Sequence, residues 1–444
     1  MLKKWFHRNS ADFRLINDLV VPMLFLQILQ LLFQLGDQAI IGRLGVEEFA
    51  AVGIASSFIF LITGTIGILC AAFNIIGGRF FGNNDIPKFG QAFNTSMTMS
   101  IMIGIMFELL LLGTGRWILG TVYDLNFAPA THYLYISGVT MGMNMVLFNF
   151  SAYFKNINQA KLLTFSFAAA GIVNIFFDYV LVFGKWGFPA LGMSGAAVGS
   201  VAGYGASIIV CIYFFRKSSL FSFSLQINRP IAKQLLKLYF PMALQDLIEY
   251  TLFAMGIMAI ISRLESEFIA SYTVVTTLLE IILIPMYCFA GSCMTITAKA
   301  YGTQQAGYTK YSYLSLQLML MISIPLTLIV ISFSYPLIAI ITDKAVVISL
   351  VEHVLPLALA LNLMNGLQMI MRSTLQAIDL EKWVLVYSGV VYAVSLVIIY
   401  VCIRKLELTG VYLGFGVSYL LLSLGYVYKL QRREPYAHVK TLSR

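Results

Sequence analysis

Charged side chains are scarce in this sequence. Asp, Glu, Lys and Arg make up 11% of the 444 residues, 59% of the residues are hydrophobic, and the mean hydropathy is +0.84. A water-soluble domain carries about 25% charged residues. A soluble fold of this composition would have too little polar surface to face water, so the sequence predicts an all-α membrane protein. Since one span takes about 20 apolar residues, the chain has room for about a dozen.

Motifs for catalysis and for ATP-driven transport are also missing. The five cysteines lie singly in apolar runs, and the four histidines are scattered without metal-ligand spacing. The sequence contains no GxxxxGK[ST] motif, no arginine-rich voltage sensor, no TVGYG filter and no nucleophile beside a base. We therefore expect neither an enzyme nor a cofactor, and we expect buried thiols rather than disulfides or a haem or zinc site.

Apolar runs separated by charged residues, glycine or proline predict twelve spans. Their approximate ranges are 15–41, 50–78, 92–120, 128–154, 161–183, 190–215, 234–262, 269–298, 311–341, 349–375, 383–403 and 408–430. With the N-terminus in the cytoplasm, 22 of the 29 Lys and Arg residues, Arg372 among them, fall on the inner side and 7 on the outer. This asymmetry predicts a multi-pass protein of the cytoplasmic membrane with both termini inside. It also accounts for the net charge of +9 without a nucleic-acid partner.

Internal repeats divide the chain into two halves. GRLGVEEFAA at 42–51 resembles SRLESEFIAS at 262–271, and RFFG at 79–82 resembles KAYG at 299–302, both at an offset of 220. Pro22-Met23 recurs as Pro241-Met242. We predict two pseudo-symmetric six-helix lobes, at 1–216 and 234–444, the second with a short cytoplasmic tail. A cytoplasmic linker at 217–233 joins them. Because each half has an even number of spans, the repeats are parallel.

Polar side chains inside the first half form two candidate groups. Gln27, Gln30, Gln34 and Asp37 step along one face of the first span. Asn174 and Asp178, four residues apart, share a face of the fifth span. An amide oxygen and a carboxylate suit a hard cation or a held proton. A structural hydrogen-bonded seam would give the same pattern.

The second half carries its own acidic residues. Asp246 and Glu249 lie three residues apart in the seventh span, and Glu280 lies in the eighth. A charge at the bilayer centre costs about 2.5 kcal/mol or more, so we expect these groups to face the bundle interior as secondary acidic groups. Glu108, isolated among apolar residues, is expected to have a structural role.

The chain resembles the multidrug and toxic compound extrusion (MATE) family. The likeness is carried by LGDQAIIGRLG, NIFFDYVLVFGKWGFPALGMSGAAVGS, PMALQDLIEYTLF and LLEIILIP, and it covers nearly the whole chain. It implies an antiporter that exchanges sodium or protons for cationic amphipathic compounds. The cation-linked positions implied by the resemblance are Asp37, Asn174, Asp178 and Ser200. Glu249 matches an acidic position of the branch with a second cation site, but the tenth span here lacks that branch's carboxylate.

The expected mechanism is alternating access. A sodium ion or proton at Asp37, Asn174 and Asp178 would neutralise buried charge and repack the first span near Pro22, with Pro241 as the corresponding hinge. Gln34, Tyr133, Tyr135 and Met141 are candidate substrate-cavity residues, since Met and aromatic side chains suit varied organic cations. The expected partners are small organic cations or amphipathic drugs and membrane lipids, and the expected state is a monomer.

Two alternatives remain open. A lipid-linked oligosaccharide flippase would carry an anionic pyrophosphate and would need arginines in its cavity, whereas the charges within the spans are almost all acidic. A membrane scaffold or receptor would leave the repeat and the buried carboxylates unexplained.

Overall fold

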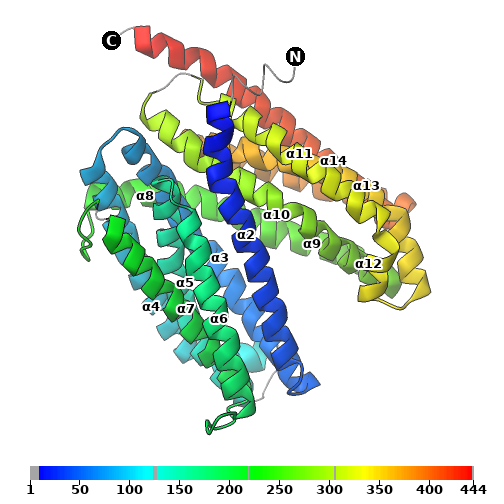
Figure 1. Ribbon diagram of the computed structural model, residues 1–444. Helices are drawn as coiled ribbons and strands as arrows, with labels where there is room; N and C mark the ends of the chain where they lie inside the picture. Colours follow the sequence, from blue (N-terminus) through cyan, green and yellow to red (C-terminus); the bar gives the residue numbers. More distant parts are fainter. Residues whose placement is uncertain (1–9, 124–127, 219, 305–306, 443–444) are drawn as a thin grey trace. The chain divides into compact units, whose positions relative to one another are not determined.

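The protein is built from long helices (Figure 1). The computed structural model describes residues 10–123, 128–218, 220–304 and 307–442, and every regular element among them is helical. The terminal segments 1–9 and 443–444, on which part of the predicted orientation depends, lie outside these residues. Even a helix of 23 residues such as α6 (Lys161–Phe183) is about 35 Å long, which exceeds the roughly 30 Å hydrocarbon core. The predicted all-α, multi-pass membrane class is confirmed.

The predicted spans all correspond to helices. Within the described residues, ten helical segments are long and apolar enough to cross a membrane. The predicted fourth span is the more polar α5 (Ala128–Asn156), and the last two share α14 (Glu381–Leu442). The backbone of Glu407 leaves the helical region there (φ 49°, ψ −130°), in the gap between the two predicted spans.

One compact unit, here called the N-terminal unit, comprises Val21–Tyr239. Its helices are α3 (Val46–Gly82), α4 (Ile86–Val122), α5, α6 and α7 (Met193–Ser218), together with most of α2 (Ser10–Ile41) and the start of α8 (Arg229–Asp246). The helix α6 packs against α7, and α5 contacts α3, α4 and α7. This unit therefore includes most of the predicted first lobe and all of the predicted linker, of which residue 219 lies outside the described part.

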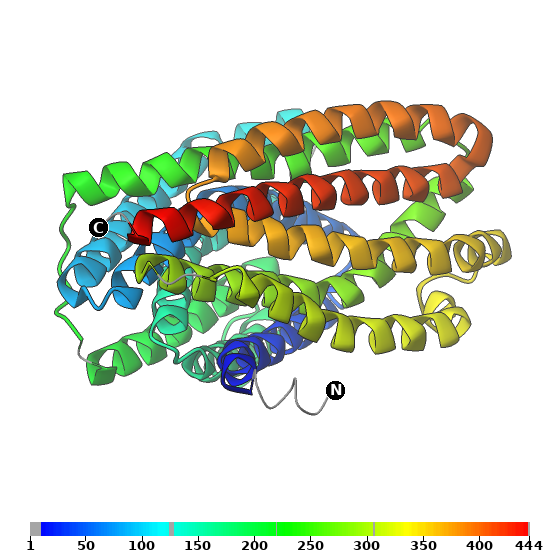
Figure 2. The ribbon, with the colours of Figure 1, turned by 90° about the horizontal axis from the view of Figure 1, so that it is seen from above.

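The other unit, here called the C-terminal unit, comprises Met1–Val20 and Phe240–Arg444. Beyond α8 it holds the π-helix η1 (Leu247–Phe253), α9 (Ala254–Ile261), α10 (Ser266–Gly302), α11 (Lys310–Ser332), α12 (Ser334–Ile341), α13 (Ala345–Ala377) and α14. Figures 1 and 2 show α11, α13 and α14 running side by side in this unit, and α10 packs along α13.

Both places where the chain passes between the units lie beside a proline. The passages fall at residues 20/21 and 239/240, next to Pro22 within α2 and Pro241 within α8. A proline inside a helix lacks the N–H that would bond one turn back, which weakens the helix locally. Residues before Pro22 are held in the C-terminal unit, where Asp12 pairs with Lys310 at 3.2 Å.

The segment that follows α7 is fixed to the N-terminal unit. Asn94 of α4 donates a hydrogen bond to Ser224 Oγ (3.0 Å), and the backbone N–H of Asn228 donates to Thr95 Oγ1 (3.1 Å). Asn228 Oδ1 in turn accepts from the N–H of Ile231 at the start of α8. The segment between α7 and α8 is therefore part of the N-terminal unit, which extends to Tyr239.

Candidate ion-coupling site

Helix α6 presents an amide and a carboxylate on one face. Asn174 Nδ2 donates a hydrogen bond to Asp178 Oδ2 at 3.2 Å, and both residues are buried, at 8% and 0% exposure. The four-residue spacing brings the side chains one turn apart, as the sequence predicted. Asp178 Oδ1 has no hydrogen-bond partner within the described part of the chain. One carboxylate oxygen is thus held and the other is left available to a ligand.

A glycine on α7 makes room for this carboxylate. A Cβ placed on Gly199 would lie 1.8 Å from Asp178 Oδ1, and one on Gly203 would lie 2.8 Å from Asn174 Cβ. Glycines spaced four apart let two membrane helices approach closely. Ser200, which the resemblance implied, is half-buried, and the structure gives it no hydrogen bond to either aspartate of the site. The residue that touches Asp178 is Gly199, which sequence reasoning missed although the Gly195-Gly199-Gly203 spacing was visible.

Helix α2 brings a second carboxylate to the site. Glycines on both helices let α2 and α6 pack closely. The ring of Phe33 on α2 lies where a Cβ of Gly171 on α6 would stand, and Ile175 on α6 packs on Gly36 of α2. One turn further, the carboxyl groups of Asp37 and Asp178 interact directly. Asp37 Oδ1 also lacks a hydrogen-bond partner among the described residues.

The two carboxyl groups have no base between them. Neither forms an ion pair with a described Lys, Arg or His residue. Two carboxylates about 4 Å apart repel each other by about 4 kcal/mol at an effective dielectric constant of 20. A shared proton, or a cation bound by both, removes that repulsion. The described residues contain no cluster of three or more His, Cys, Asp or Glu side chains suited to a tightly held metal ion. The side chains that meet at this point are thus two carboxyl groups and the amide of Asn174.

The four predicted substrate-cavity residues have different environments in the structure. Tyr133 is buried, contacts Ser56 through its hydroxyl (3.1 Å) and lies within electrostatic range of Asp37 and Asp178. Tyr135 packs instead on Gly115 of α4. Met141 belongs to a buried apolar cluster, and Gln34 is exposed. Of the four, Tyr133 is within electrostatic range of both aspartates, and Gln34 lies one turn before Asp37 on α2.

The predicted hinge at Pro22 is connected to the helix that bears Asp178. Thr164 Oγ1 on α6 donates a hydrogen bond to the carbonyl oxygen of Pro22 at 3.3 Å.

Glu108 lies elsewhere, with its carboxylate against Gly138 of α5 and with Oε2 unpartnered in the described chain.

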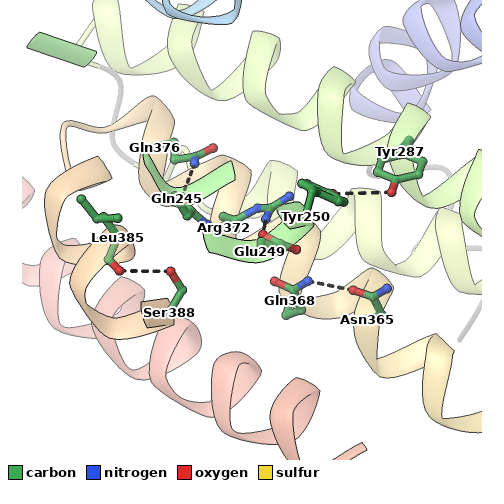
Figure 3. Close-up of polar contacts among 10 residues, drawn as sticks. All are labelled: Gln245, Glu249, Tyr250, Tyr287, Asn365, Gln368, Arg372, Gln376, Leu385 and Ser388. Carbon is green, nitrogen blue, oxygen red and sulfur yellow. Dashed lines mark hydrogen bonds and ion pairs between the residues drawn. The ribbon is translucent and has the colours of Figure 1, made fainter. Parts of the chain in front are cut away.

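In the C-terminal unit the buried acid has a base (Figure 3). Glu249 on η1 forms an ion pair with Arg372 of α13, and the two side chains are only 13% and 15% exposed. One turn away on each helix, Gln376 donates a hydrogen bond to Gln245 at 2.9 Å. Asp246, next to η1, is half-buried and within electrostatic range of both charges. Arg372, expected on the inner side from the charge asymmetry, pairs with an acidic residue of the seventh span.

Glu280 does not join this pair. It is exposed and lines a separate cavity with residues of α13 and α14. The three secondary acidic residues therefore have different surroundings. Glu249 is paired with Arg372, Asp246 lies near that pair, and Glu280 has no ion-pair partner among the described residues.

Comparisons with known proteins place this architecture among transporters. The sequence model of the MatE family matches residues 22–180 and 241–401, two segments that each begin at a repeated proline. The chain is 24% identical over 358 residues to a "Probable multidrug resistance protein NorM" of Neisseria meningitidis serogroup B, covering 78% of this chain and 77% of the relative. It is 23% identical to a "Probable multidrug resistance protein YoeA" of Bacillus subtilis, covering 94% of each chain. Its fold matches the Vibrio cholerae MATE transporter VcmN in the bent form (TM-score 0.87, 18% identity, 97% and 99% coverage).

Proposed function

Because the chain belongs to the MatE family of membrane transporters, we propose that it is a secondary active multidrug efflux antiporter. It exchanges sodium ions or protons for cationic amphipathic compounds across the cytoplasmic membrane, with both termini inside and with the monomer as the working unit. The names of its NorM and YoeA relatives support drug efflux. The observation that carries ion coupling is the contact between the buried Asp178 and the half-buried Asp37, two carboxyl groups without a described base.

In this proposal the coupling ion binds between the two aspartates. The Asp178 oxygen that faces Gly199 and the free oxygen of Asp37 receive it, and Asn174 holds the remaining Asp178 oxygen. Binding removes the repulsion between the carboxylates and so favours a tighter packing of α2 on α6. An organic cation in the same negative environment competes with the ion, and this competition is sufficient to couple their opposite movements.

The prolines supply the movement. The two passages between the units lie at Pro22 and Pro241, and the Thr164 hydrogen bond ties Pro22 to the helix of Asp178. Ion binding on α6 is thereby connected to the point where α2 leaves the N-terminal unit. We propose alternating access by bending at these two points. The parts that move are then the predicted lobes 1–216 and 234–444, except that residues 1–20 move with the second lobe.

One ion site per protein follows from the charges. The Arg372 guanidinium already neutralises Glu249, so the C-terminal unit does not need a cation at that position. The N-terminal pair has no such internal counter-charge. We therefore assign coupling to Asp37 and Asp178 alone.

The test uses the full chain in liposomes with efflux of a fluorescent organic cation as the readout. A sodium gradient and a pH gradient are imposed separately on wild type and on Asp178→Asn. Efflux that follows one gradient and is lost in the variant identifies the coupling ion and supports the assignment. Full gradient-driven efflux by Asp178→Asn would refute it.

The alternative is a lipid-linked oligosaccharide flippase, whose anionic cargo requires unpaired basic groups. The buried arginine of the C-terminal unit is already engaged by Glu249, which disfavours this function. Absence of cation efflux under both gradients, with movement of a lipid-linked pyrophosphate, would support it instead.

A further inference from the structure

A cavity of about 190 Å³ lies within the C-terminal unit, and neither Glu249 nor Arg372 lines it. Helices α10, α13 and α14 form its walls. The polar and aromatic residues that line it are Thr276, Glu280, Asn362, Asn365, Tyr412, Phe415 and Tyr419. Leucines and an alanine complete the lining. The cavity thus combines one carboxylate, several hydrogen-bonding groups and an apolar wall.

Two hydrogen-bond donors of the lining are buried without a partner. Asn362 and Tyr412 are 3% and 2% exposed, and neither Asn362 Nδ2 nor Tyr412 Oη has a hydrogen-bond partner in the described part of the chain. A buried donor left unsatisfied costs about 1–3 kcal/mol. Both residues line the same cavity, so a ligand with an oxygen acceptor can satisfy donors that the protein leaves unpaired there.

The orientation of Asn362 is fixed by its neighbours on α13. Gln368 Nε2 donates to Asn365 Oδ1 at 2.8 Å, and Asn365 Nδ2 donates to Asn362 Oδ1 at 3.1 Å. Figure 3 shows the first of these contacts. Because the Asn362 oxygen already accepts a hydrogen bond, its nitrogen is the atom left for a ligand. The chain of amides therefore presents a donor, and not an acceptor, to the cavity.

The remaining features favour a cation. Glu280 has no ion-pair partner among the described residues. The ring of Phe415 lies 6.0 Å from those of Tyr412 and Tyr419, measured between centroids. Aromatic faces attract organic cations, and an unpaired carboxylate adds charge complementarity. The volume also limits the ligand, since a cavity of about 150 Å³ already holds benzene.

We propose that this cavity is a substrate subsite for the ammonium-bearing end of a protonated single-ring amine whose chain carries an oxygen acceptor. Glu280 and the aromatic rings receive the ammonium group, and Asn362 and Tyr412 donate to the oxygen. The proposal rests on the proposed efflux function and adds a preference within the cationic compounds. Amines with a carbonyl oxygen a few bonds from the nitrogen are preferred over equally long amines without one.

The test compares two probes of equal length by calorimetric binding to the purified full chain. The first is 2-(diethylamino)ethyl benzoate, and the second is N,N-diethyl-4-phenylbutan-1-amine, which lacks the oxygen acceptors. Wild type is expected to bind the ester more tightly. Tyr412→Phe keeps the ring and removes the hydroxyl, so the affinity for the ester should fall about three- to tenfold while that for the hydrocarbon amine stays within about twofold. Glu280→Gln should weaken both probes by about tenfold.

Tyr426→Phe is the matched control, because Tyr426 is a buried tyrosine of the same helix that does not line the cavity. It should leave both affinities unchanged. Equal affinity of wild type for the two probes, or an unchanged ester affinity in Tyr412→Phe, would overturn the proposal. Failure of the proposed function is recognised separately: it appears as gradient-driven efflux retained by Asp178→Asn, whatever the probe affinities are.

Discussion

In the N-terminal unit, Asp37 and Asp178 bring two carboxyl groups together without a described base, whereas in the C-terminal unit Glu249 lies against Arg372. Each arrangement takes one acid from the first span of a repeat, a few turns after the repeated proline: Asp37 on α2 and Glu249 on η1. The partner comes from another helix, Asp178 from α6 and Arg372 from α13. In the proposed function the first arrangement binds an external cation or proton, whereas the second is neutralised by Arg372. Under that proposal, two halves with the same helical plan differ in ion dependence because one of them carries its own counter-charge.

Removal of one carboxylate of the Asp37–Asp178 pair should have the largest effect on transport. Asp37→Asn leaves Asp178 without the partner that shares its ion, so gradient-driven efflux in liposomes should fall by about 100-fold or more, corresponding to about 3 kcal/mol of lost ion binding. The matched control is Glu108→Gln, another carboxylate among the helices of the same unit but apart from the pair. It should retain efflux. Equal losses in both variants would show that any buried charge in this unit matters in the same way.

Removal of the C-terminal base should have the largest effect on stability. Arg372→Met leaves Glu249 buried without its counter-charge, which is expected to cost about 3–5 kcal/mol. The double variant Glu249→Leu/Arg372→Leu removes both charges and should recover most of that loss, since apolar residues often replace a buried ion pair at little cost. Thermal unfolding in detergent measures both. If the double variant is as unstable as the single one, the pair does not act as a self-neutralising unit.

Filling the space beside Asp178 should lower both the thermal stability of the protein and its affinity for the coupling ion. Gly199→Ala places a Cβ 1.8 Å from Asp178 Oδ1, and such overpacking typically costs about 1–3 kcal/mol. The midpoint of thermal unfolding should fall, and protection by the coupling ion should shrink. Gly205→Ala on the same helix meets only Met143 at 3.7 Å and should behave as wild type. Similar behaviour of the two alanine variants would contradict the close approach of α7 to Asp178.

The smallest effect is expected at the supporting amide. Asn174→Ala removes one hydrogen bond to Asp178, worth about 1 kcal/mol, so the ion concentration for half-maximal efflux should rise about fivefold. Ser200→Ala, at the position next to Gly199 on α7, should change this half-maximal ion concentration by less than about twofold. A larger effect at Ser200 than at Asn174 would assign the role of supporting ligand to the serine.

Much of the fold could be predicted from the sequence, because the bilayer dictates helix length and because polar residues among apolar ones are few. The contact between Asn174 and Asp178 followed from a four-residue spacing within one helix. The Glu249–Arg372 pair did not follow. It joins residues far apart in the chain, and the alternation of loops had placed Arg372 with the cytoplasmic charges. The π-helix that carries Glu249 leaves no pattern in composition or periodicity.

The neighbours of Asp178 show the same limit. Ser200 was expected from a resemblance, yet Gly199 is the residue in contact. Which of two adjacent positions on α7 faces α6 depends on the rotation of one helix about its axis, and side-chain chemistry alone does not determine that rotation. The glycine spacing was the available signal, since close helix contacts in membranes favour small residues.

In the proposed mechanism the coupling ion binds between Asp37 and Asp178 and nowhere else in the protein. The most direct test of this mechanism is a count of coupling ions bound per protein, made on purified wild type, on Asp178→Asn and on Glu249→Leu/Arg372→Leu with the ion identified by the liposome experiment. The predicted result is about one ion for wild type, none for Asp178→Asn and about one for the double variant. An ion that remains bound in Asp178→Asn, or is lost in the double variant, would contradict the account.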